Sequence, residues 1–338
     1  MSPTFAHPNA SYDAHMPAID EPAATERNAP ALAKLAQSRC PVCGEGLGTA
    51  LLEARDLMWS VPGRFSVARC EGCELGVTLP LVDDAQLGSF YPAAYGAHSP
   101  QLTGALALVS KGMQRALAWQ ALHSVPLSHL AAIGPGRLLD VGCGNGELGA
   151  WLVRRGWTVV GVEPSADACA VARERGLEAR EGILADVELE PSAYDAVVFR
   201  HSLEHVTDPV ADLRRVRDAL HGDGVAILSL PHFDCWQREK FGECWFNLEV
   251  PRHRFHFNAA SLRSTLAAAG FTRTVTHTST SAIALPASIQ YALTGRFLLG
   301  SGLKLRIAIA ACDLAAPLSW LVNRLAGSGD LLHAVAYK

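Results

Sequence analysis

Three alternating glycines, Gly142, Gly144 and Gly146, stand between two acids, Asp140 and Glu163. Glycine has no Cβ, so it can take an unusual φ and lets backbone N–H groups lie against a ligand. An acid at the carboxyl end of the following strand can accept both hydroxyls of a ribose. The spacing therefore predicts a site for a cofactor that contains a nucleoside.

Asp140 indicates which charge the cofactor carries. A carboxylate two residues before Gly142 would repel a pyrophosphate but suits a cation, such as the sulfonium and ammonium of S-adenosylmethionine (SAM). Gly144, Gly146 and Gly149 also satisfy the dinucleotide pattern G-x-G-x-x-G, which is a weak signal alone. The run DVGCGNG closely resembles the glycine motif of class I SAM-dependent methyltransferases, D-x-G-x-G-x-G.

This resemblance implies the remaining contacts to the cofactor. Ile183 and Leu184 stand where members of the family meet the adenine ring, so we expect both to pack the base. The predicted cofactor-binding residues are Asp140, Gly142, Cys143, Gly144, Gly146, Glu163, Pro164, Ile183, Leu184 and His201.

Histidines cluster where the acceptor should bind. Methyl transfer from a sulfonium is an in-line displacement that depends on positioning, and a hydroxyl or amine acceptor must also lose a proton. Histidine is the natural base near neutral pH. His253 lies in a dense run of aromatic and histidine residues, and His205 belongs to a segment that resembles the family's Glu-His-x-x-Asp-Pro. We predict His253 as the first candidate base and His205 as the second.

A helical conformation would place His201 and His205 on one face. A divalent metal held by His201, Glu204 and His205 is then an alternative, because ubiquinone-pathway O-methyltransferases carry a similar segment that is richer in acids. His201 replaces one of those acids, which argues against the metal.

Four of the nine cysteines form two C-x-x-C pairs, Cys40 with Cys43 and Cys70 with Cys73. A tetrahedral zinc ion needs four thiolates, and each pair offers two from one tight turn. Two such pairs so close in sequence predict a structural zinc ribbon, with a hairpin between them. A zinc ion with four cysteine ligands has no open position for catalysis. The alternative, a thioredoxin-like redox motif, is not favoured because the flanking βαβ pattern is absent.

The elements that position these residues follow from hydrophobic periodicity. A strand, a glycine turn, a helix and a second strand over 137–163 predict the first half of a Rossmann-like unit. We expect an α/β fold with a seven-stranded, mostly parallel sheet, whose last strand (332–337) is antiparallel. The predicted regions are a disordered leader (1–37), a zinc ribbon (38–80), a helical linker or lid (81–130) with Tyr91 and Tyr95, and a methyltransferase domain (131–338) with a helical insertion at about 283–328.

Composition sets the remaining limits. A net charge of -4 and a pI near 6.3 give no electrostatic attraction to nucleic acid, and the N-terminus has no signal-peptide pattern. We therefore expect a cytoplasmic protein. The order of a zinc ribbon, an aromatic linker and the glycine motif resembles a bacterial group of methyltransferases, and this resemblance implies a small-molecule acceptor, such as a sugar, a polysaccharide precursor or a lipid-linked metabolite. The apolar stretch 283–325 leaves open a peripheral membrane contact or a homodimer. The competing functions are an NAD-dependent sugar-modifying enzyme and a non-catalytic zinc-ribbon adaptor with a relic fold.

Overall fold

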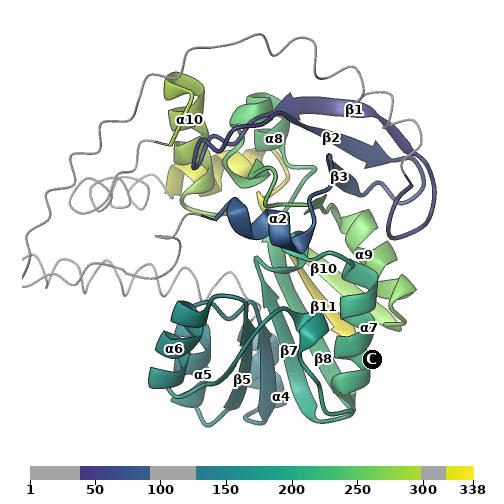
Figure 1. The fold of residues 1–338 in the computed structure, drawn as a ribbon, viewed down its shortest axis with the longest axis vertical. Helices are drawn as coiled ribbons and strands as arrows, with labels where there is room; N and C mark the ends of the chain where they lie inside the picture. The colour runs from purple at the N-terminus through teal and green to yellow at the C-terminus, as the bar shows by residue number, and fades with distance from the viewer. Residues whose placement is uncertain (1–38, 92–126, 298–316) are drawn as a thin grey trace, which may run out of the picture.

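The computed structural model describes residues 39–91, 127–297 and 317–338. A seven-stranded sheet forms the body of the molecule, and a four-stranded sheet lies above it (Figure 1). The predicted leader (1–37), Tyr95, Cys312 and most of the predicted helix before residue 130 lie outside the described residues.

The large sheet has the strand order β10-β11-β8-β7-β4-β5-β6. Its strands are β4 (Arg137–Val141), β5 (Thr158–Glu163), β6 (Glu178–Glu181), β7 (Tyr194–Arg200), β8 (Leu220–Pro231), β10 (Arg273–Ser279) and β11 (Leu331–Tyr337). β11 pairs antiparallel with both β8 and β10, and the pairs from β8 to β6 are parallel. The predicted fold class is therefore confirmed. The apolar run after the glycines at 222 and 224 predicts a strand over 225–230, and β8 begins earlier, at Leu220.

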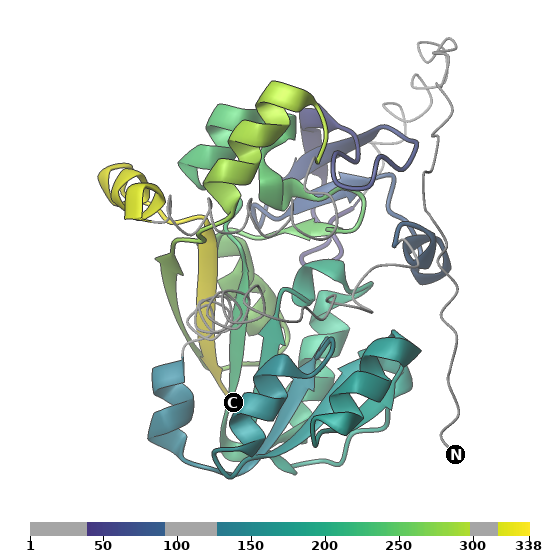
Figure 2. The same cartoon turned by 90° about the vertical axis from the view of Figure 1, so that its left-hand side faces the viewer.

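Helices cover both faces of this sheet (Figure 2). One core joins the strands to α7 (Pro209–Ala219) and α9 (Ala259–Ala268). The other joins them to α4 (Leu127–Ile133), α5 (Glu147–Val153) and α6 (Ala166–Glu174). Local signals in the sequence mark where two of these helices begin and end. The Asp208 carboxylate accepts from the N–H groups of Val210 and Ala211 at the start of α7, and Gly176 takes φ +94° after α6.

The small sheet has the order β1-β2-β3-β9. Its strands are β1 (Leu47–Ala54), β2 (Phe65–Cys70), β3 (Gly76–Leu79) and β9 (Phe255–His256). The first three form the ribbon, and the hairpin between β1 and β2 fills the interval between the cysteine pairs. β9 lies far from the other three strands in the sequence, after β8, and pairs antiparallel with β3. The ribbon thus shares a sheet with the segment that carries His253.

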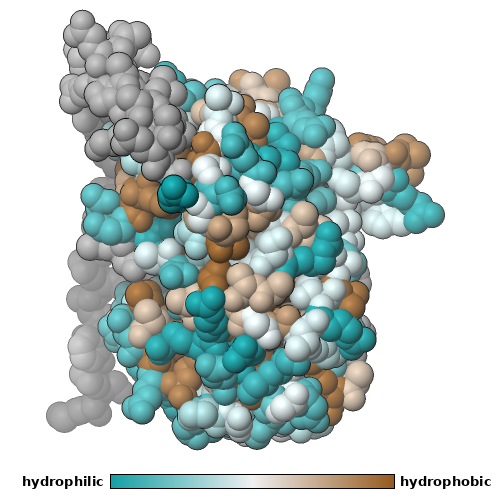
Figure 3. All heavy atoms as spheres, turned by 90° about the vertical axis from the view of Figure 1, so that its right-hand side faces the viewer, coloured by the Kyte–Doolittle hydropathy of each residue, from teal (hydrophilic) through white to brown (hydrophobic). Residues whose placement is uncertain are grey.

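The C-terminal part adds helices around the upper rim. α10 (Ala284–Thr294) and a helix over 317–325 lie in the predicted insertion. The second helix exposes Leu318, Trp320 and Leu325, and Figure 3 shows hydrophobic side chains where it projects from the body. No helix in the described ranges is both long and apolar enough to cross a membrane. Membrane contact and dimerisation through 283–325 stay predictions.

Candidate functional site

The site lies at the carboxyl edge of the large sheet, between β4 and β7. The chain builds β4, β5 and β6 toward one edge of the sheet and then returns to build β7 and β8 on the other side. Ligands of open α/β sheets bind at this reversal of strand order. The turn after β4 carries the glycines, and the turn after β7 carries His201, Glu204 and His205.

The two turns are in contact. A Cβ built on Gly142 would lie 2.7 Å from Cβ of Ser202, so only glycine fits there. Gly144 differs, because a Cβ built on it meets no atom within 4 Å. Both glycines have positive φ, +73° and +53°. Gly142 therefore lets the two turns approach each other, whereas Gly144 leaves open space beside the backbone where a ligand can lie.

Glu163 stands at the end of β5 beside this space. Its carboxylate accepts from the backbone N–H of Gly144 at 2.9 Å and of Ser165 at 3.0 Å. Burial raises its pKa, and these two hydrogen bonds oppose the rise. Two N–H groups therefore fix the orientation of this half-buried carboxylate at the edge of the open space.

Asp140 is buried at the end of β4, with 2% of its surface exposed. Burial raises its pKa to about 6, the charge of Arg200 lowers it, and Glu163 raises it further. A cation beside Asp140 would favour the ionised carboxylate, which suits the sulfonium inferred from the sequence.

The other predicted cofactor residues occupy varied positions. The Cys143 side chain is buried against Gly161, so only its backbone is available to a ligand in the turn. Leu184 packs in the core, Ile183 is half-buried and Pro164 is exposed. Adenine packing by Ile183 and Leu184 remains a prediction.

His201 and His205 do not lie on one α-helix. His201 has φ +52° directly after β7, and only Leu203–His205 forms a 3-10 turn. Nδ1 of His201 lies 3.5 Å from the Glu204 carboxylate, and this histidine side chain is 40% exposed. The left-handed φ at His201 is a feature that periodicity could not reveal.

His253 is buried and carries a positive charge. Its Nδ1 lies 2.9 Å from the carbonyl oxygen of Asn247, and its Nε2 lies 3.2 Å from the Glu249 carboxylate. Both partners can only accept, so both ring nitrogens hold protons. Burial lowers the pKa of His253, but the hydrogen bond and charge of Glu249 and the charge of Glu204 raise it overall.

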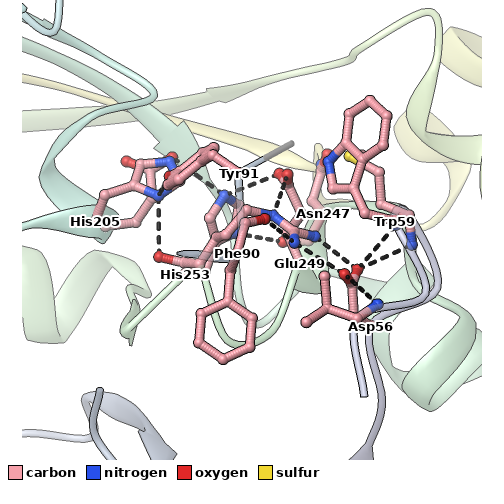
Figure 4. Close-up of polar contacts among 12 residues, drawn as sticks. Asp56, Trp59, Phe90, Tyr91, His205, Asn247, Glu249 and His253 are labelled. Carbon is pink, nitrogen blue, oxygen red and sulfur yellow. Dashed lines mark hydrogen bonds and ion pairs between the residues drawn. The ribbon is translucent and has the colours of Figure 1, made fainter. Parts of the chain in front are cut away.

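His205 is neutral. Its Nδ1 lies 3.0 Å from the carbonyl oxygen of Arg252 and 3.1 Å from the Tyr91 hydroxyl. The carbonyl requires a proton on Nδ1, so the neutral ring has a lone pair on Nε2. Burial and the positive charge of His253 lower the pKa of His205 to about 4. Figure 4 shows Tyr91, His205 and His253 grouped at this point.

Glu204 is 1% exposed, and neither carboxylate oxygen has a hydrogen-bond partner among the described residues. Glu204, His205 and His253 each offer an atom within 4.8 Å of the others. The imidazolium of His253, whose Nε2 is 4.0 Å from Glu204, supplies the positive charge beside this carboxylate. These three side chains could also hold a metal ion, so a metal beside this turn stays an alternative.

The four ribbon cysteines converge on one point. Sγ of Cys40 lies 3.6 Å from Sγ of Cys73, and Sγ of Cys43 lies 3.3 Å from Sγ of Cys70. All four thiols lie within 4.8 Å of one another and none is in a disulfide. A tetrahedron with Zn–S bonds of about 2.3 Å has S···S edges of about 3.8 Å, so this set fits a zinc ion with modest adjustment.

The strand order with its antiparallel β11, the glycine turn and the acid at the switch point together match the class I methyltransferase fold, and sequence comparisons agree. The family described as "Methyltransferase domain" matches residues 111–277. This region is therefore a methyltransferase domain of the class I, SAM-dependent type, as the sequence predicted.

Two curated relatives are named "Ubiquinone biosynthesis O-methyltransferase". The protein of Xanthomonas campestris pv. campestris is 35% identical over 119 residues, which are 32% of this chain and 50% of the relative. That of Xanthomonas oryzae pv. oryzae is 33% identical over 153 residues, 41% of this chain and 63% of the relative. The matches thus span half to somewhat under two thirds of these relatives. A SAM-dependent methyltransferase structure from Mesorhizobium loti superposes with a TM-score of 0.45 at 18% identity, over 67% of this chain and all of the other.

Proposed function

We propose that this chain transfers the methyl group of SAM to a hydroxyl of a small-molecule acceptor. The observation that carries the proposal is the open space beside Gly144, with Glu163 at one side and the buried Asp140 at the end of the adjoining strand. The name of the two Xanthomonas relatives supports transfer to oxygen. A sugar, a polysaccharide precursor or a lipid-linked metabolite is the acceptor class we propose.

In this mechanism the two histidines have different roles. His205 is neutral, so its Nε2 accepts the proton of the acceptor hydroxyl. His253 keeps its charge and holds Glu204 and Glu249 in place. This reverses the order in which the sequence ranked the two bases, because a histidine that is already protonated cannot accept a further proton. Tyr91 fixes His205 through its hydroxyl group.

We further propose that Cys40, Cys43, Cys70 and Cys73 hold a structural zinc ion. The S···S distances support this assignment. A zinc ion with four thiolates has no open position, so its contribution is to hold the two knuckles together and with them the ribbon.

Isothermal titration with SAM, S-adenosylhomocysteine and NAD tests the cofactor. We expect SAM and S-adenosylhomocysteine to bind with micromolar affinity, of the order typical for enzyme ligands, and NAD not to bind. Transfer of labelled methyl from SAM to a panel of phenols and nucleotide sugars then tests the acceptor. Binding of NAD without SAM would overturn the proposal, and binding of SAM without turnover on any acceptor would favour an adaptor.

Gly144→Ala should separate folding from cofactor binding. The new Cβ meets no protein atom, so the free energy of unfolding should fall only by about 1–2 kcal/mol for the left-handed φ. The methyl group would occupy space needed by the cofactor, and we expect SAM affinity to fall at least about tenfold, or 1.4 kcal/mol. Calorimetric titration and thermal unfolding measure the two effects.

The matched control is Gly134→Ala. Gly134 also has positive φ, +83°, and open space around its Cβ position, but it lies before β4 at the opposite end of the sheet. This variant should show the same loss of stability with unchanged SAM affinity. Equal affinities in both variants would mean that SAM does not pass beside Gly144.

A further inference from the structure

A buried chain of charges links the ribbon to the acceptor side of the site. Asp56 follows β1 in the ribbon hairpin, and its carboxylate accepts from both terminal nitrogens of Arg252 at 3.0 and 2.7 Å. The side chains of Arg252 and Asp56 are 0% and 1% exposed. Asp56 also accepts from backbone N–H groups of its own loop, including Met58 and Val61. The carboxylate is therefore fixed by its loop before it engages Arg252.

Arg252 in turn holds Glu249. Nε of Arg252 lies 3.2 Å from Oε1 of Glu249, and Nε2 of His253 lies 3.2 Å from the other oxygen, Oε2 (Figure 4). The carboxylate is divided between two cations, one oxygen to each. A planar guanidinium can hold two acceptors in one geometry in a way that an ammonium cannot. The position of Glu249 Oε2 is thus set through Arg252 from the ribbon.

Close packing of this region does not by itself require a buried network of charged side chains. A buried ion pair often contributes no more stability than apolar residues of the same volume, because desolvation of the charges is costly. Glu249 has φ +45°, a left-handed backbone conformation that residues other than glycine rarely adopt. The network maintains this conformation and brings the carboxylate to His253, so its evident effect is orientation.

We propose that the β1–β2 loop of the ribbon is a working part of the acceptor site, with Asp56 and Arg252 as positioning residues that hold Glu249 on Nε2 of His253. The role of this relay in catalysis rests on the proposed methyltransferase function. Its effect on the protonation of the His253 ring can be measured whether or not the protein transfers a methyl group. The ribbon therefore acts on the site through a defined set of hydrogen bonds in addition to the β3–β9 pairing.

The charged groups that face His253 determine the expected response. Glu249 follows the 3-10 turn Phe246–Leu248, and its pKa is about 2, because His253 outweighs the effect of burial. Glu204 and the neutral His205 lie on the turn after β7. His256 lies on β9, and burial and His253 lower its pKa to about 3, so it is neutral as well.

Without the Asp56 charge, the Arg252 guanidinium is neither neutralised nor fixed, so its positive charge opposes that of His253 and its Nε no longer keeps Glu249 in place. Both effects disfavour the protonated His253 ring. His253 should then lose its second ring proton at a lower pH than in the wild type.

The test uses full-length, zinc-loaded protein labelled with ¹⁵N-histidine, in which the ring-nitrogen shifts are followed with pH by NMR. His253→Gln assigns the signal. We expect Asp56→Asn and Arg252→Lys to move the His253 titration to lower pH than in the wild type, because Lys retains the charge but not the two-acceptor geometry. The matched control is Asp234→Asn, which removes another ion pair between the ribbon and the methyltransferase domain, with Arg69, outside the relay.

The relay is overturned if Asp56→Asn and Arg252→Lys titrate like the wild type with zinc still bound. It is also overturned if Asp234→Asn produces the same shift, since a loosened ribbon would then suffice. If Asp56→Asn does not fold, Arg252→Lys alone tests the relay, because the lysine keeps a positive charge beside Asp56. SAM titration of each variant separates the questions: a protein that ignores SAM but shows the His253 shift contradicts the proposed function and retains the relay.

Discussion

Replacing Glu163 by alanine should weaken SAM binding by about a hundredfold. The carboxylate is oriented by the N–H groups of Gly144 and Ser165, and under the proposed function it accepts from the ribose hydroxyls. Hydrogen bonds to a charged group contribute about 1.5–3 kcal/mol each, so at the lower value the loss of two amounts to roughly 3 kcal/mol, or a factor of about 100. Isothermal titration with SAM and with S-adenosylhomocysteine measures it, and both ligands should be affected because both contain the ribose.

Glu181→Ala is the matched control for this substitution. Glu181 stands at the end of β6, opposite Glu163 in the register of the two strands, and is exposed. It has the same charge and a similar position along the sheet edge, but it lies one strand farther from the glycine turn. We expect SAM affinity within about twofold of the wild type, a difference below 0.5 kcal/mol. If Glu163→Ala also stays within that range, the cofactor site is elsewhere.

Replacing Cys73 by serine should remove the zinc ion and unfold the ribbon. Binding of a structural zinc ion is worth about 10–16 kcal/mol in zinc-finger peptides, far more than the small ribbon core can replace. The loss reaches beyond the ribbon, because β3 would no longer pair with β9 and Asp56 would leave Arg252. Even a loss of about 4 kcal/mol would lower the melting temperature by roughly 10 °C. Elemental analysis should find one zinc ion per chain in the wild type and almost none in the variant.

Cys244→Ser provides the comparison for this experiment. Cys244 is a half-exposed free thiol outside the ribbon, so its replacement should leave zinc content and melting temperature unchanged. Zinc retained at full occupancy in Cys73→Ser would contradict the four-thiolate site. An unchanged melting temperature in a zinc-free variant would instead show that the ribbon folds through its own core and its contacts with the large domain.

The features that could be predicted are those whose signals are local. The alternating glycines with Glu163 predicted a strand, a turn and a strand, because positive φ and the end of a strand depend on a few neighbouring residues. The two C-x-x-C pairs predicted a ribbon for the same reason. Asp208 before Pro209 marked the start of α7 through its own capping hydrogen bonds.

The acceptor side could be predicted only as a collection of histidines. Whether a histidine is a base depends on its tautomer and charge, which the groups around it determine. Glu249 and Glu204 raise the pKa of His253 in spite of its burial, whereas burial and the positive charge of His253 lower the pKa of His205. Sequence spacing cannot reveal these partners, so it placed His253 first.

The fold class, the glycine turn and the cysteine set follow from the amino-acid sequence alone, since each is encoded by residues close together in the chain. The link between the ribbon and the segment around His253 becomes visible only in the folded chain, where the two-residue strand β9 and the ion pair between Asp56 and Arg252 form it. A strand of two residues has no periodicity to detect. A buried ion pair between residues far apart in sequence has no local signal, because its geometry exists only once both segments are packed in the folded chain.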